Sequence, residues 1–269
     1  MSSRRATAWA LALICPLALS VGCKEVAPKE ATSLSQDPGK DPGPPKKKLT
    51  MVWHHHSTGD NLLKGGLLAA LKGNNIDFYD INYKEAKVDG YVIGDKTDPP
   101  DFPKNFNTPK FFDVIKKWEL KGDKKQHDIV MFKSCYPASQ IDSDAKLEQY
   151  KSWYKSMLPT FKANPDILFI AMSTPPLVRR NTKVENAARA RKWSKWITTE
   201  YAKDLKNVQV FDLFNSLAVR EGKKHANTLV PQFAKDKWDS HPTDAGAKAM
   251  TRMFIPWFNR ALQKAGKGS

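Results

Sequence analysis

The stretch "LTMVWHHHSTGDNLL" (residues 49–63) contains the turn on which the fold depends. An apolar run at residues 49–53 is followed by three histidines, a Ser-Thr-Gly turn and apolar residues at helical spacing over 62–71. A short apolar run before a turn and a helical pattern predicts a buried β-strand that leads into a helix. The folded part is therefore expected to begin with a strand–turn–helix unit.

The same alternation continues along the chain. It predicts strands over 76–83, 128–133, 167–172 and 208–213, and helices over 111–120, 147–161, 184–205 and 245–262. Strands separated by helices are typical of a parallel sheet whose right-handed crossovers place helices on both faces. We therefore expect an α/β fold with a five-stranded parallel sheet, and a ligand site beyond the carboxyl ends of its strands.

Two segments at these strand ends indicate nucleophilic catalysis. Ser57 follows the first predicted strand, where the amides of the next helix favour charge that develops on an oxygen. A serine hydroxyl needs a base, usually a histidine that is oriented by an acid. His241 in "DSHPTDAG" (residues 239–246) is the candidate base. Asp239 is the candidate acid, with Asp236 as the alternative.

Four motifs carry a resemblance to a known family. "HHSTGDN" (55–61), "IGDKTD" (93–98), "MFKSCYP" (131–137) and "DSHPTDAGAK" (239–248) occur in this order. Together they resemble the SGNH/GDSL-type hydrolase superfamily, in particular an atypical bacterial branch with HHSTG and FKSC-P blocks. The resemblance covers residues 49–265. It implies a flavodoxin-like three-layer α/β/α sandwich and ester or acyl-transfer chemistry, with Ser57 as nucleophile and His241 as base.

The resemblance also implies an oxyanion hole that includes the Ser57 amide. Its second block implies a glycine amide, for which Gly94 is the better candidate and Gly90 the weaker. Its third block implies an asparagine, and this chain has Lys133-Ser134-Cys135 there instead. We expect Ser134 to donate in its place and Lys133 to offset negative charge. One lost donor costs about 10²–10³ in rate, so this departure bears directly on activity.

The last block departs from the family as well. The superfamily usually places its acid three residues before the histidine, where this chain has Trp238. Asp239 comes one residue later, and this D-x-H spacing occurs among acetyltransferase relatives.

The histidine triplet also raises the question of a metal. In an extended strand His54 and His56 point to one face and His55 to the other. Zinc sites need three or four ligands, and the remaining histidines stand without ligand spacing. We expect no metal and no organic cofactor, and we assign His55 and His56 to supporting the turn that carries Ser57.

Cys135 is the cysteine of the predicted folded part. We expect a buried, inert thiol, because a nucleophilic cysteine would need a lowered pKa.

The N-terminal segment predicts export. Arg4 and Arg5 precede an apolar run at residues 8–21, which ends at Cys23 in a lipobox-like context. Residues 1–23 are thus predicted to be a signal peptide, with lipidation of Cys23 as an anchor to the bacterial cell envelope. A periplasmic or secreted protein is the alternative. Residues 24–48, rich in Pro and Lys, predict a disordered linker before a domain at 49–269.

Composition limits the partners. The net charge is +16, and 41% of the residues are hydrophobic, which is enough for a core. A basic surface favours anionic polymers, and no nucleic-acid-binding signature is present. We expect a serine esterase or acetylesterase, or an acyltransferase, that acts on a small-molecule or polysaccharide ester of a carbohydrate or cell wall. The alternative is a non-catalytic, lipid-anchored glycan- or cell-wall-binding module with a degenerate fold. The sequence indicates no oligomeric state.

Overall fold

The computed structural model describes residues 40–268. Its main sheet is parallel throughout, with the order β2-β1-β5-β6-β7. This is the flavodoxin-like order, in which the first strand lies between the second and the third of the sheet. The predicted five-stranded parallel α/β fold is therefore confirmed. The strands are β1 (Leu49–His54), β2 (Ile76–Ile81), β5 (Ile129–Phe132), β6 (Leu168–Met172) and β7 (Val208–Phe211).

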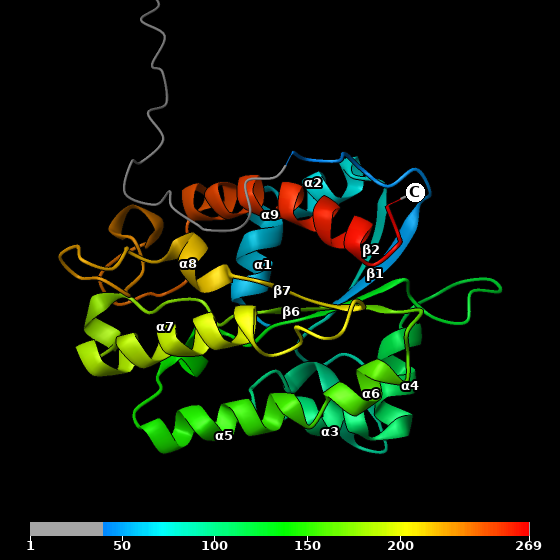
Figure 1. The fold of residues 1–269 in the computed structure, drawn as a ribbon, viewed down its shortest axis with the longest axis horizontal. Helices are drawn as coiled ribbons and strands as arrows, with labels where there is room; N and C mark the ends of the chain where they lie inside the picture. The colour runs from blue at the N-terminus through cyan, green and yellow to red at the C-terminus, as the bar shows by residue number, and fades with distance from the viewer. Residues whose placement is uncertain (1–39, 269) are drawn as a thin grey trace, which may run out of the picture.

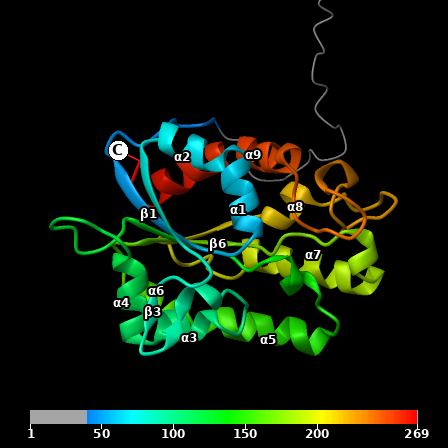
Figure 2. The same ribbon diagram turned by 180° about the vertical axis from the view of Figure 1, so that it is seen from behind.

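Helices cover both faces of the sheet and make the molecule three layers thick (Figures 1 and 2). One layer holds α1 (Thr58–Leu62), the π-helical turn η1 (Leu63–Leu67), α2 (Leu68–Gly73), α8 (Leu213–Leu217) and α9 (Asp244–Lys264). The other holds α3 (Phe102–Asn107), α4 (Pro109–Lys117), α5 (Asp144–Lys155), α6 (Leu158–Lys162) and α7 (Val184–Thr199).

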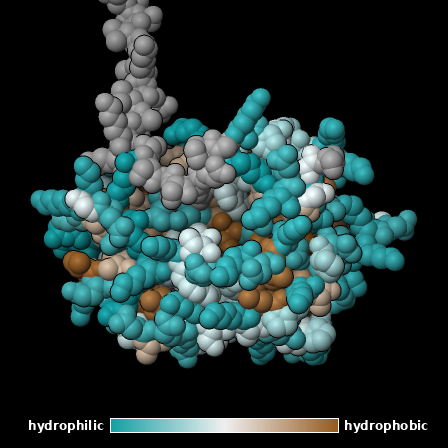
Figure 3. Space-filling view, viewed as in Figure 1, coloured by the Kyte–Doolittle hydropathy of each residue, from teal (hydrophilic) through white to brown (hydrophobic). Residues whose placement is uncertain are grey.

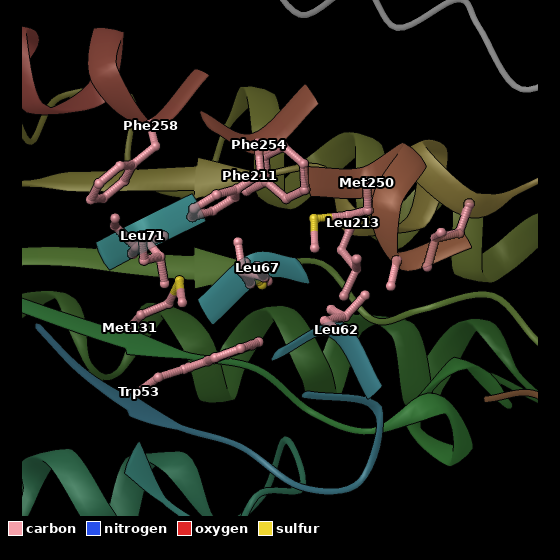
Figure 4. Close-up of a cluster of buried hydrophobic side chains, with 14 of the residues drawn as sticks. Trp53, Leu62, Leu67, Leu71, Met131, Phe211, Leu213, Met250, Phe254 and Phe258 are labelled. Carbon is pink, nitrogen blue, oxygen red and sulfur yellow. The ribbon is translucent and has the colours of Figure 1, made fainter. Parts of the chain in front are cut away.

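Two apolar clusters fill the spaces between these layers. Met51 and Trp53 of β1 belong to the same cluster as Phe254 and Phe258 of α9. Figure 4 shows Trp53 and the two phenylalanines among its side chains. Val52 of β1 points the other way, into the cluster under α3 to α7. All six residues of β1 are buried, as expected for a strand that is covered on both faces. The sheet therefore holds the chain at the end of β1 rigidly.

The largest differences between the predicted element bounds and the structure are at two helices. The helix predicted over 147–161 is two helices, because Pro159 lies in the first turn of α6 and has no N–H to continue the α5 ladder. The helix predicted over 184–205 ends at Thr199.

The segment between the predicted strand over 76–83 and the predicted helix over 111–120 contains structure of its own. It forms a hairpin of β3 (Lys87–Val88) and β4 (Tyr91–Val92), the 3₁₀ turn η2 (Ile93–Asp95) and helix α3. The remaining 3₁₀ turns are η3 (Tyr136–Ser139), η4 (Arg179–Asn181) and η5 (Pro231–Phe233).

The end of the predicted linker lies against the domain. Asn75 donates a hydrogen bond to the Pro45 carbonyl at 3.1 Å, and Asn259 donates one to the Asp41 carboxylate at 2.9 Å. The predicted signal peptide, Cys23 and the rest of the linker lie outside the described residues. Between residues 40 and 268 no helix has the length and apolar character to cross a membrane. The face seen in Figure 3 is covered mainly by hydrophilic side chains.

Candidate active site

The structure brings Ser57, His241 and Asp239 together. Ser57 Oγ lies 2.9 Å from His241 Nε2, and His241 Nδ1 lies 2.6 Å from Asp239 Oδ1. The Ser57 side chain makes no capping bond to α1, although serine often caps a helix. Its hydroxyl is therefore directed to the histidine, in the order of nucleophile, base and acid that acyl transfer requires.

The two-residue spacing of the acid suits this geometry. Asp239 Oδ1 also accepts the backbone N–H of His241 at 2.9 Å, so one oxygen binds both the backbone and the ring. Partial burial works against ionisation of Asp239, but these hydrogen bonds outweigh it and lower its pKa. Asp236, the alternative acid, instead accepts the N–H groups of Trp238 and Asp239 and shapes the turn.

Cys135 lies in the same site. Its Sγ is 3.1 Å from Ser57 Oγ and 3.2 Å from Thr58 Oγ1. Burial raises the pKa of the thiol. The neighbouring His241 ring and the Lys133 charge reverse this and lower the pKa to about 5. Cys135 in turn, opposed by partial burial and assisted by Asp239, raises the pKa of His241. The thiol is buried as expected, but the condition named for a nucleophilic cysteine, a lowered pKa, is met here.

Lys133, two residues before Cys135, is fully buried. Its Nζ donates to the carbonyl oxygens of His56 and Ser134 at 3.4 and 3.3 Å. Burial lowers the pKa of Lys133 to about 8, although the negative charges of Cys135 and Asp60 act to raise it.

Neither predicted oxyanion donor faces Ser57. The Gly94 N–H donates to the Glu85 carbonyl at 3.1 Å, so it is already engaged. A Cβ at position 94 would lie 2.5 Å from the Tyr83 carbonyl, so glycine is needed there for close backbone packing. The Ser134 hydroxyl is fully buried beside Tyr154. This arrangement does not support either assignment, and both stay predictions.

Tyr83 takes a place that the sequence did not reveal. The Ser57 N–H donates to the Tyr83 hydroxyl at 3.1 Å. The Tyr83 ring stacks on His56 with centroids 4.5 Å apart and an interplanar angle of 8°, and 43% of the residue is exposed. Tyr83 lies just after β2, the neighbour of β1 in the sheet, and this position could have indicated that it lies near Ser57.

The three histidines hold the backbone around Ser57. His54 Nε2 and His56 Nε2 donate to the carbonyls of Ile93 and Gly94 at 2.9 and 2.6 Å. Burial lowers the pKa of His54 to about 3, so this ring is neutral. His55 packs against Trp53 and Gly59, and a Cβ on Gly59 would lie 2.3 Å from His55 Nδ1.

One group among residues 40–268 has the composition of a metal site: His55, Asp60 and Asp80. Asp60 Oδ1 lies 3.9 Å from His55 Nδ1, whereas Asp80 Oδ2 lies 3.6 Å from His55 Nε2. The two carboxylates thus lie nearest to opposite nitrogens of the His55 ring. A single metal ion binds only one nitrogen of an imidazole. Each of the three residues nevertheless offers one ligand atom within 4.8 Å of the other two, so the expectation of no metal stays a prediction.

Comparisons with known proteins find likeness in structure only. No sequence family and no curated protein matches the chain. A solved structure of a gut microbial diltiazem-metabolizing enzyme is similar over 80% of this chain, with a TM-score of 0.50 and 14% identity. A family two carbohydrate esterase from Cellvibrio japonicus is similar over 83%, with a TM-score of 0.44 and 13% identity. The chain spans 48% of the first protein's length and 63% of the second's. The first likeness shows a shared α/β fold.

Proposed function

We propose that the chain is a serine hydrolase of the SGNH/GDSL type that acts on ester bonds. The observation that carries this proposal is the continuous contact from Ser57 Oγ to His241 and on to Asp239, at 2.9 and 2.6 Å. The flavodoxin-like strand order and the four sequence blocks support it. Its chemistry needs no metal or organic cofactor.

The reaction follows from the hydrogen bonds. His241 Nε2 removes the Ser57 proton as Oγ bonds to the acyl carbon, and the same nitrogen then protonates the departing alcohol. Asp239 keeps the proton of the neutral ring on Nδ1 and stabilises the charged ring. Water or a second alcohol then attacks the acyl-serine by the same route.

The developing oxyanion has two donors near Ser57. One is the Ser57 N–H, and the other is the Tyr83 hydroxyl that this N–H now contacts. When a substrate oxygen enters, it takes the place of the Tyr83 oxygen as the acceptor of the Ser57 N–H, and the displaced Tyr83 hydroxyl donates its own proton to that substrate oxygen. Tyr83 thus replaces the two donors expected at Gly94 and Ser134.

The substrate we propose is an acylated carbohydrate or cell-wall polymer. Trp238, next to Asp239, is 57% exposed, and Arg180 lies over its ring at 4.8 Å. An exposed aromatic face binds apolar faces of sugars, and the +16 net charge attracts anionic polymers. A lipid anchor at Cys23 would hold the domain at the cell envelope near such a polymer.

Turnover of p-nitrophenyl acetate and labelling by a fluorophosphonate probe test the proposal. We expect wild type to be labelled at Ser57, His241→Ala to lose labelling, and Ser57→Ala to lose at least about 10²-fold in turnover. Ser152→Ala, on the exposed face of α5, is the matched control.

A non-catalytic binding module is the second candidate, favoured by the engaged Gly94 amide and the buried Ser134 hydroxyl. Wild-type protein without labelling or turnover on several ester chain lengths would decide for it.

A further inference from the structure

Three polar side chains surround the Cys135 sulfur. Strand β5 pairs with β1, and His54 lies opposite Phe132, so the chain after β5 reaches Ser57. The hydroxyls of Ser57 and Thr58 lie 3.1 and 3.2 Å from Sγ, and the His241 ring, whose Nε2 is 2.9 Å from Ser57 Oγ, lies near enough to lower the pKa of the thiol. A thiol is a weak donor with little need of three partners, whereas a thiolate is stabilised by every one of them.

Lys133 gives an independent reason for negative charge at this sulfur. Its ammonium is fully buried, and its hydrogen bonds go to two carbonyl oxygens. Within residues 40–268 no carboxylate lies within 4.0 Å of it as an ion-pair partner. A buried charge without a counter-ion is costly. The Cys135 sulfur and the more distant Asp60 supply the negative charge that acts on this ammonium.

We propose that Cys135 is a second nucleophile of this site, which shares the His241–Asp239 pair with Ser57 and carries an acyl group as a thioester. The inference rests on the proposed ester chemistry. The Ser57 hydroxyl has a single proton, so it donates either to His241 Nε2 or to Cys135 Sγ. When His241 is neutral, the first arrangement prepares Ser57. When the proton of Cys135 has moved to His241, the second prepares Cys135.

Atoms and charge balance in both the acylation and the deacylation step of the thioester route. The Cys135 thiolate bonds to the acyl carbon, the bond from that carbon to the alcohol oxygen breaks, and the alcohol leaves with the proton of His241 Nε2. Neutral His241 then takes a proton from water as the water oxygen bonds to the thioester carbon. The carbon–sulfur bond breaks, the carboxylic acid leaves, and the thiolate and charged His241 are restored.

Acyl trapping tests this step. Wild type, Ser57→Ala, Cys135→Ala and the double variant are mixed with p-nitrophenyl acetate, quenched in acid and mapped by peptide mass spectrometry. We expect Ser57→Ala to carry one acetyl group on Cys135 that hydroxylamine removes, and the double variant to carry none. If wild type turns over and Ser57→Ala has no acetyl group on Cys135, the inference is overturned while the proposed function stands. If wild type neither turns over nor is acetylated, both fail.

A second measurement requires no change at the nucleophiles. The groups that face Cys135 are His241, Lys133, Tyr136 and the two hydroxyls. We expect the rate at which iodoacetamide alkylates Cys135 of the wild-type chain to stay nearly constant as the pH falls to about 6. An ordinary thiol titrates near pH 8.5, and its rate would fall steeply over the same range. In His241→Ala the rate at pH 6 should fall about tenfold. A wild-type rate that rises only above about pH 8 would contradict a thiolate here.

Discussion

The Ser57 amide and the Tyr83 hydroxyl are joined at 3.1 Å, so the backbone donor next to the candidate nucleophile is occupied by a side chain that is itself a donor. Tyr83 has φ +39°, an unfavourable value for a residue with a Cβ, and its ring lies flat on His56. His56 in turn donates to the Gly94 carbonyl at 2.6 Å. The loop between β2 and α3 thus positions the tyrosine at the carboxyl end of β1.

Tyr83→Phe tests this arrangement. Removal of one oxyanion donor costs about 10²–10³ in rate, so we expect kcat for p-nitrophenyl acetate to fall about 10²-fold. The ring keeps its stacking on His56, so the free energy of unfolding should change by less than about 0.5 kcal/mol. Tyr79→Phe, on β2, is the matched control and should keep its rate. Equal rates for wild type and Tyr83→Phe would remove Tyr83 from the oxyanion hole.

The pH dependence should report His241. Its pKa is raised above 6.5, first by Cys135 and then by Asp239, so the neutral base is lost as pH falls through a value above 6.5. We expect kcat/KM of the Ser57 reaction to fall on that acid side. In Cys135→Ala the largest cause is gone, so the midpoint should move down toward 6.5. A profile of kcat/KM against pH for both proteins makes the measurement, and an unmoved midpoint would argue against the Cys135–His241 contact.

The same shift affects stability with a definite sign. Because the folded-state pKa of His241 is raised, its contribution to the free energy of unfolding is complete below about pH 6.5 and is lost as pH rises through the higher folded value. Urea midpoints of wild type and His241→Gln, measured from pH 5 to 9, should therefore converge on the alkaline side. A difference that widens above pH 8 would show the opposite linkage.

The sheet and the Ser57–His241–Asp239 geometry followed from local signals. Apolar runs located the five strands, and the meeting of parallel carboxyl ends placed residues from β1 and from the chain after β7 at one edge. The role of Cys135 was not predicted, because the sequence does not show which of Lys133, Ser134 and Cys135 faces Ser57. That depends on the register between β1 and β5, in which His54 is paired with Phe132. Tyr83 was missed because its position depends on a loop that folds back through long-range contacts such as His56 to Gly94.

Asp239→Asn separates the two candidate acids. The amide keeps an oxygen for the His241 N–H but loses the charge that stabilises the protonated ring, so we expect kcat to fall about 10³–10⁴-fold. Asp236→Asn is the matched variant, because an amide oxygen still accepts the N–H groups of Trp238 and Asp239. Its rate should stay within about threefold of wild type. If Asp236→Asn lost the activity and Asp239→Asn kept it, the acid would be assigned to the wrong residue.

Gly59→Ala tests how tightly the turn after Ser57 is packed. The new Cβ would lie 2.3 Å from His55 Nδ1, and the His55 ring is fully buried and packed against Trp53. Overpacking of this kind costs about 1–3 kcal/mol, so the urea midpoint should fall. Gly73→Ala, at the end of α2, is the control, because a Cβ there meets nothing within 4 Å. That variant should be neutral or more stable by about 0.4–1 kcal/mol, since alanine restricts the unfolded chain. Equal midpoints for the two variants would mean that His55 yields, and that the histidine does not fix the position of Ser57.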